Sequence, residues 1–207
     1  MLLDFQEQMQ ERISKISDAQ TREAAAKHLN AKRTMYLEAA ESIVRRISKH
    51  ITTSEYLVLA QELLNDVDFS RAERYFQRAV EASNALTIQR IVALRSLGGF
   101  YFAPGPSRDV EKASRQFQLA TEQLSNPSDP YSIFTQGVTY ELWGLSMLLQ
   151  GFKVEGTRLV DRARKYYEDL PSTFPWRQSS LELLPNKVAA ALAGHLPSPA
   201  GTTTPEL

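Results

Sequence analysis

Cysteine is absent from the 207 residues of this chain. Its absence excludes disulfide bridges, thiolate zinc sites and cysteine nucleophiles, and it fits a reducing compartment. The first residues, Met1 to Phe5, lack the basic region and the long apolar run of a secretory signal peptide. The most apolar segment, Leu142 to Leu149, is much shorter than the ~20 residues that a membrane-spanning helix needs. We therefore expect a cytoplasmic protein that has no membrane partner.

The chain also lacks a net charge, because 24 acidic residues balance 24 basic ones. A neutral protein has no overall field that would attract nucleic acid or an anionic membrane. One segment departs from this balance, since residues 19–51 carry seven basic and three acidic side chains. This basic segment is either a solvated helix face or a docking surface for nucleic acid or an acidic protein. Nucleic acid is thus an unfavoured partner that the sequence does not exclude.

Motifs that carry chemistry are missing as well. The three histidines, His28, His50 and His195, stand on different segments without the spacing of metal ligands. The stretch from Asp66 to Asp68 begins like a calcium loop, but the glycine and glutamate that such a loop needs further on are absent. There is no phosphate-binding loop and no serine nucleophile motif. We therefore expect neither an enzyme, nor a metal site, nor a bound cofactor.

Glycine and proline are absent from residues 2–51, so nothing in that segment stops a helix. Asp18 could cap a new helix, which leaves open whether the segment is one kinked helix or two. Apolar residues from Leu2 to Ile16 recur at helical spacing. That stripe either covers the flank of the helices that follow, or it forms the seam of a homodimer through residues 2–16.

Small residues recur in a fixed pattern along the middle of the chain. One small residue stands in each helix of a predicted hairpin. Counted from the second of them, an aromatic or branched residue follows at +4 and a further small residue at +7. The pattern occurs three times, as Ala60, Ala72, Phe76 and Ala79, as Gly98, Ala113, Phe117 and Ala120, and as Gly144, Gly156, Val160 and Ala163. Small residues at the paired positions let the two helices of a hairpin approach each other. The sequence therefore predicts a stack of three helix hairpins.

This pattern resembles the tetratricopeptide repeat (TPR). The first helices also supply the large residue and the leucine or tryptophan that the TPR motif places before its small residue, namely Tyr56 and Leu59, Leu94 and Leu97, and Tyr140 and Trp143. The copies are longer than the family period of about 34 residues. The surplus lies in the turn from Ala103 to Ser107 and before the first helices of the second and third repeats. We expect lengthened first helices and one long loop.

The fold class we expect is all-α, a TPR-like helix-hairpin solenoid with an N-terminal helical extension and C-terminal capping helices. Residues 1–51 form the N-terminal helical segment, residues 52–171 the three hairpins, residues 172–196 the capping helices and residues 197–207 a disordered tail. Within the capping region, Pro185 divides two short helices, one from Ser179 to Leu184 and one from Asn186 to His195.

The resemblance to TPR proteins implies a non-enzymatic protein–protein interaction module, an adaptor, scaffold or chaperone-like protein. In that family the partner lies along the first helix of each repeat. The chaperone-binding subclass holds a terminal carboxylate with Lys, Asn and Arg, but the matching positions here are Leu57, Gln61, Ser96, Val138 and Leu142, so that clamp is absent. We expect an apolar or amphipathic peptide instead. The predicted partner-binding residues are Leu57, Gln61, Arg95, Phe102, Glu141 and Leu145.

Three alternatives remain open at this level. Arg95 and Glu141 could pair with each other across adjacent first helices instead of serving a ligand. The chain could be a nucleic-acid-associated regulator that uses the basic segment 19–51. It could also be a structural protein that assembles through residues 2–16.

Overall fold

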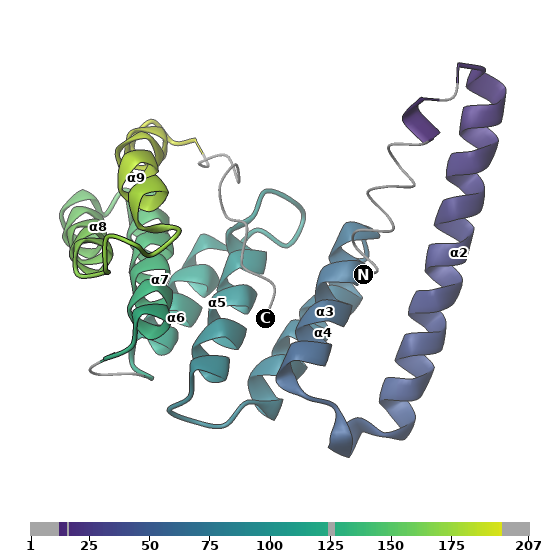
Figure 1. Cartoon of the computed structure of the whole chain (residues 1–207), viewed down its shortest axis with the longest axis horizontal. Helices are drawn as coiled ribbons and strands as arrows, with labels where there is room; N and C mark the ends of the chain where they lie inside the picture. The colour runs from purple at the N-terminus through teal and green to yellow at the C-terminus, as the bar shows by residue number, and fades with distance from the viewer. Residues whose placement is uncertain (1–12, 16, 124–126, 196–207) are drawn as a thin grey trace. The chain divides into compact units, whose positions relative to one another are not determined.

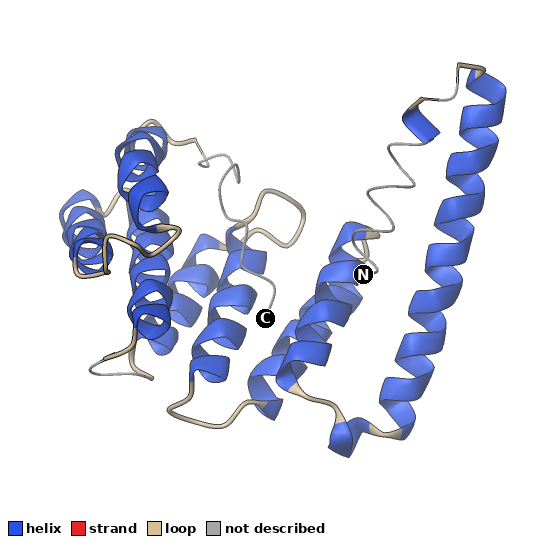
Figure 2. Ribbon diagram, in the orientation of Figure 1, coloured by secondary structure: helices blue, strands red, loops and turns tan. Residues whose placement is uncertain are grey.

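The computed structural model of the chain describes residues 13–15, 17–123 and 127–195. Every regular element in these ranges is helical, and Figure 2 shows helices joined by loops. The predicted all-α fold is therefore confirmed. The chain divides into two compact units, residues 1–51 with 65–67, and the remainder. The predicted dimer seam at residues 2–16 lies almost wholly outside the described residues, and the predicted tail at 197–207 lies entirely outside them.

The first unit contains helix α2, Ala19–Arg46, and a short 3₁₀ helix, Ser48–His50 (Figure 1). Asp18 caps α2 as predicted, because its carboxylate accepts a hydrogen bond of 2.7 Å from the backbone N–H of Thr21. The last turn carries Arg45 and Arg46, whose positive charges suit the negative end of the helix dipole. A new helix therefore begins after Asp18.

The second unit consists of seven α-helices in its described part, each joined to the next by a loop. In chain order they are α3 (Thr53–Asn65), α4 (Phe69–Ala82), α5 (Ile88–Phe102), α6 (Val110–Thr121), α7 (Pro130–Leu149), α8 (Lys153–Glu168) and α9 (Arg177–Leu192). The expected long first helix of the third repeat is α7, with 20 residues. The expected long loop follows α5 and is closed by a 2.8 Å hydrogen bond from the N–H of Asp109 to the carbonyl of Tyr101.

Five of these helices begin at a side chain that satisfies an otherwise unpaired backbone N–H. The caps are Thr52, Asp68, Thr87, Asp109 and Asp129, each accepting from the N–H three residues later. Caps of this kind contribute about 1 kcal/mol each. Pro130, directly after the last cap, occupies the first turn of α7, where its missing N–H costs nothing. Local sequence therefore determines where these helices start.

Within two hairpins the helices touch at the small residues that the sequence singled out. A Cβ atom on Gly98 of α5 would lie 2.6 Å from the Phe117 ring of α6. A Cβ atom on Gly144 of α7 would lie 2.9 Å from the carbonyl oxygen of Gly156 in α8. Real Cβ atoms do not approach other atoms so closely, so only glycine fits here. The predicted helix–helix contact at Gly156 is confirmed, and Ala72 and Ala60 are fully buried.

The hairpins also contact one another in chain order. Helix α4 packs on α5, α6 packs on α7, and the two first helices α5 and α7 touch as well. Aromatic rings fill the α4–α5 contact, where Phe76 and Phe100 have centroids 5.5 Å apart. Polar side chains join α6 to α7, where the hydroxyls of Ser114 and Ser146 are 2.7 Å apart. This packing order is that of a solenoid of helix hairpins.

The capping region is one helix in the structure, and the prediction of two short helices divided by Pro185 is wrong. Helix α9 runs through Pro185, whose side chain is exposed. A proline inside a helix costs about 3 kcal/mol. Burial on both sides of it offsets that cost, since Leu184 and Ala191 are 0% and 1% exposed and α9 packs against both α7 and α8.

Candidate functional site

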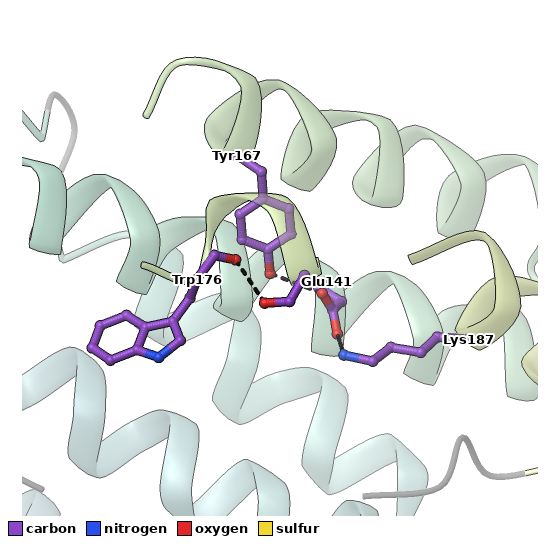
Figure 3. Close-up of polar contacts among 5 residues, drawn as sticks. Glu141, Tyr167, Trp176 and Lys187 are labelled. Atoms are coloured by element: carbon purple, nitrogen blue, oxygen red, sulfur yellow. Dashed lines mark hydrogen bonds and ion pairs between the residues drawn. The ribbon is translucent and has the colours of Figure 1, made fainter. Parts of the chain in front are cut away.

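Glu141 lies in the middle of α7 and is almost completely buried, with 2% of its surface exposed. Two groups from other helices neutralise and solvate its carboxylate. The Tyr167 hydroxyl of α8 donates to Oε2 at 2.8 Å, and the Lys187 ammonium of α9 donates to Oε1 at 2.6 Å. Figure 3 shows both side chains converging on this carboxylate. Glu141 is thus paired inside the protein, and the alternative in which it pairs with Arg95 is not what the structure has.

The hydroxyl of Tyr167 is held in its neutral form. Burial raises the pKa of Tyr167 well above its ordinary value, and the neighbouring charge of Glu141 raises it further. The phenol therefore keeps its proton and donates a hydrogen bond to the carboxylate. This network, which we call the Glu141 triad (Glu141, Tyr167 and Lys187), joins α7, α8 and α9.

An aromatic cluster fixes the start of α9 beside α7. The Phe134 ring of α7 has centroids 5.4 Å from Phe174 and 5.3 Å from Trp176. These two residues belong to the loop that leads into α9. Together with the Glu141 triad, the cluster holds α9 against α7 at Glu141, one of the predicted partner-binding residues.

Three of the six predicted partner-binding residues have little or no accessible surface. Leu145 is 0%, Glu141 2% and Phe102 8% exposed. The Phe102 ring meets the edge of Phe117, with centroids 6.3 Å apart, so it fills the seam between α5 and α6. A partner would reach these three side chains only if their neighbours moved. Their contact with a partner stays a prediction.

The other three predicted residues keep accessible surface. On α3, Leu57 is half-buried and Gln61, one turn further along, is exposed. On α5, Arg95 is half-buried. These residues come from the first helices of the first and second hairpins. The accessible part of the predicted site therefore belongs to α3 and α5.

Arg95 has an unusual environment for a cation. Among the described residues it forms no hydrogen bond and no ion pair, and the groups with which it interacts electrostatically are Tyr131 and Tyr167. Burial lowers the pKa of its guanidinium, although a guanidinium stays charged at neutral pH. Arg95 is therefore a partly desolvated positive charge surrounded by phenol side chains.

Open space lies beside Arg95 on the same helix face. Gly99 follows one turn later, so it shares the face of Arg95. A Cβ atom on Gly99 would meet nothing within 4 Å, in contrast to the clash at the adjacent Gly98. No side chain covers the backbone at this point, which leaves room for another chain to approach closely.

Lys187 and Tyr167 as partners of Glu141, and the open backbone at Gly99, were not foreseen as parts of the site. Tyr167 had a usable signal, because it follows Ala163 by four residues and shares its buried face. Lys187 had none, since its position depends on the path of the loop before α9. For Gly98 and Gly99 the sequence was informative in part. The repeat pattern explains Gly98, and it gives no reason for a second glycine at position 99.

In the residues that the structure describes, no group of three or more histidine or acidic side chains is arranged to hold a metal ion. None of the described helices has the length and apolar character needed to cross a membrane. Comparison of the chain with protein-family models, curated proteins and solved structures gives no match.

Proposed function

We propose that the chain is a non-enzymatic protein–protein interaction module of the TPR type. Its partner would be an apolar or amphipathic peptide segment that lies across the first helices α3 and α5. The observation that carries this proposal is the row of accessible residues on those helices, Leu57, Gln61, Arg95 and Gly99, at the positions where TPR proteins bind their partners.

The hairpin stack supports the same proposal. The close contacts at Gly98, Gly144 and Gly156 bring the helices of two hairpins together in the way that TPR hairpins require. Leu57 offers apolar surface and Gln61 offers an amide that can both donate and accept hydrogen bonds. An amphipathic segment suits this mixture, since apolar anchors supply affinity and a few polar contacts supply direction.

Binding to a peptide pool tests the proposal. The probe is a randomised pool of amphipathic peptides of about twelve residues, which span about 40 Å when fully extended. The full chain is compared with the Leu57→Ala variant and with a matched control, Val154→Ala, which truncates an 87% exposed apolar residue on the second helix α8. We expect Leu57→Ala to weaken binding about fivefold or more, as truncation of an anchor residue does, and Val154→Ala to leave it unchanged.

Two outcomes would contradict the proposal. One is that no peptide pool binds the full chain. The other is that the two truncations weaken binding equally, because the peptides would then recognise exposed apolar surface in general and not the α3–α5 face. Thermal melting of each variant shows whether it remains folded.

A further inference from the structure

The charges around α5, α7 and α9 do not balance. Four cations, Arg90, Arg95, Arg177 and Lys187, and one anion, Glu141, occupy half-buried or buried positions on these three helices. Arg90 and Arg177 donate hydrogen bonds to backbone carbonyls, those of Val80 and Glu168. Lys187 already neutralises the carboxylate of Glu141, since Nζ and Oε1 are 2.6 Å apart and the two side chains are 14% and 3% exposed. Among the residues that the structure describes, Arg95 forms no ion pair, so its positive charge has no counter-ion there.

The neighbours of Arg95 do not supply the missing negative charge. Tyr131 and Tyr167 are phenols, which are neutral at physiological pH. The hydroxyl of Tyr167 is also committed elsewhere, because it donates to Glu141 at 2.8 Å. A charge that has lost part of its hydration is costly unless it is paired, so Arg95 sits in an environment that a counter-ion would improve.

The space next to Arg95 suits an incoming peptide. Arg95 is half-buried, so the residue keeps part of its accessible surface, and Gly99 presents bare backbone on the same helix face. A peptide can therefore pass close to α5 at Gly99 while one of its side chains reaches Arg95. A carboxylate matches the planar fork of guanidinium donors with two parallel hydrogen bonds, and such charge-assisted pairs are strong.

We infer that Arg95 is the recognition point for an acidic side chain, Asp or Glu, within the partner peptide that crosses α5 at Gly99. This inference rests on the proposed peptide-binding function and adds the sign and the position of the charge that the partner must carry. A side chain is favoured over a terminal carboxylate because a peptide that crosses α5 at Gly99 continues on both sides of Arg95. Glu141 then acts as a positioning residue, which keeps Lys187 paired and leaves Arg95 free for the ligand.

Matched peptide pools test the inference. Three pools share one amphipathic design, are blocked at both ends, and carry Glu, Gln or Lys at one central position; a fourth carries Gln and a free terminal carboxylate. The proteins are the full chain, Arg95→Gln, Arg95→Glu and a control, Arg74→Gln, at an exposed arginine of α4. We expect the full chain and the control to prefer the Glu pool over the Gln pool about tenfold or more. Arg95→Gln should lose this preference, and Arg95→Glu should shift it to the Lys pool.

Each remaining outcome overturns the inference in a recognisable way. If the pools bind the full chain equally, peptide binding survives but the acidic side chain is wrong. If Arg95→Gln still prefers the Glu pool, another residue recognises the acidic side chain. If the full chain prefers the pool with the free terminal carboxylate, the recognised group is the end of a peptide and not a side chain. If none of the four pools binds the full chain, the proposed function fails as well. Arg95→Gln removes an unpaired charge, so it should melt at the same temperature as the full chain or a higher one, and this measurement separates lost recognition from lost folding.

Discussion

Two adjacent glycines on α5 have opposite surroundings. A Cβ atom on Gly98 would lie 2.6 Å from a carbon of the Phe117 ring, which is 0% exposed and has no room to turn away. A Cβ atom on Gly99 would meet nothing within 4 Å. One glycine is therefore needed for the contact between α5 and α6, whereas the other costs helix stability without gaining a contact inside the chain. The second kind of glycine is expected where another molecule comes close.

The adjacent alanine substitutions should change stability in opposite directions. Gly98→Ala should lower the free energy of unfolding by about 1–3 kcal/mol, because the methyl group overpacks the contact with Phe117. Gly99→Ala should raise it by about 0.5–1 kcal/mol, because alanine loses less backbone entropy in a helix. Urea unfolding of both variants measures the difference. Equal effects would mean that the packing of α5 on α6 differs from the one described.

Helix α9 decides how much of α7 a partner can reach. The Glu141 triad ties α9 to α7 and α8, and the rings of Phe134 and Trp176, with centroids 5.3 Å apart, hold its start. The helix therefore does more than cover apolar residues at the end of the stack. It also buries inner positions of the third hairpin, and it leaves the accessible surface on α3 and α5.

Removal of Lys187 should destabilise the chain more than joint removal of the charged pair. Lys187→Met leaves the carboxylate of Glu141 buried without its cation, which should cost about 3–5 kcal/mol. The double variant Glu141→Gln with Lys187→Met removes both charges, so its loss should be smaller than that of Lys187→Met alone. Lys165→Met, at an exposed position of α8, is the control and should change stability by less than about 0.5 kcal/mol. A loss in the double variant as large as that in Lys187→Met, or larger, would contradict this coupling of the two charges.

At the scale of the whole molecule, a neutral chain carries its excess positive charge in one segment. The basic side chains of residues 19–51 are mostly exposed, among them Arg45 and Arg46 in the last turn of α2. The proposed peptide site belongs to the other unit, on α3 and α5. The two candidate functions, peptide binding and nucleic-acid binding, therefore depend on different residues and respond differently to salt.

Neutralisation of α2 separates these functions. If the peptide proposal holds, Arg45→Gln with Arg46→Gln should leave the affinity for the amphipathic pool within about twofold of the full chain, and added salt should weaken it only moderately. A nucleic-acid binder should instead hold duplex DNA or single-stranded RNA with an affinity that falls steeply with salt and falls again in this variant. Titrations of both probes at low and high salt measure this. Strong, Arg45-dependent binding of nucleic acid together with weak peptide binding would favour the alternative function.

Much of the fold could be predicted because it depends on neighbours along the chain. Asp18 starts α2 because its carboxylate reaches an N–H three residues away. Gly98, Gly144 and Gly156 were assigned to helix contacts because their spacing relative to the helix period is visible in the sequence. The break expected at Pro185 did not occur, because burial of Leu184 and Ala191 outweighs a local preference. A local rule fails where contacts with distant helices contribute more free energy.

The sequence by itself determined the all-helical class, most helix starts and the small residues of the hairpins, since caps and helical periodicity act over a few residues. Only the tertiary structure decided which charges meet. Lys187 and Glu141 are 46 residues apart, and their pairing depends on the path that the loop around Phe174 and Trp176 gives to α9. That pairing holds Glu141 of the predicted site inside the protein, and Arg95 has no counter-ion among the described residues. Long-range packing sets this charge balance, and no short-range pattern in the sequence encodes it.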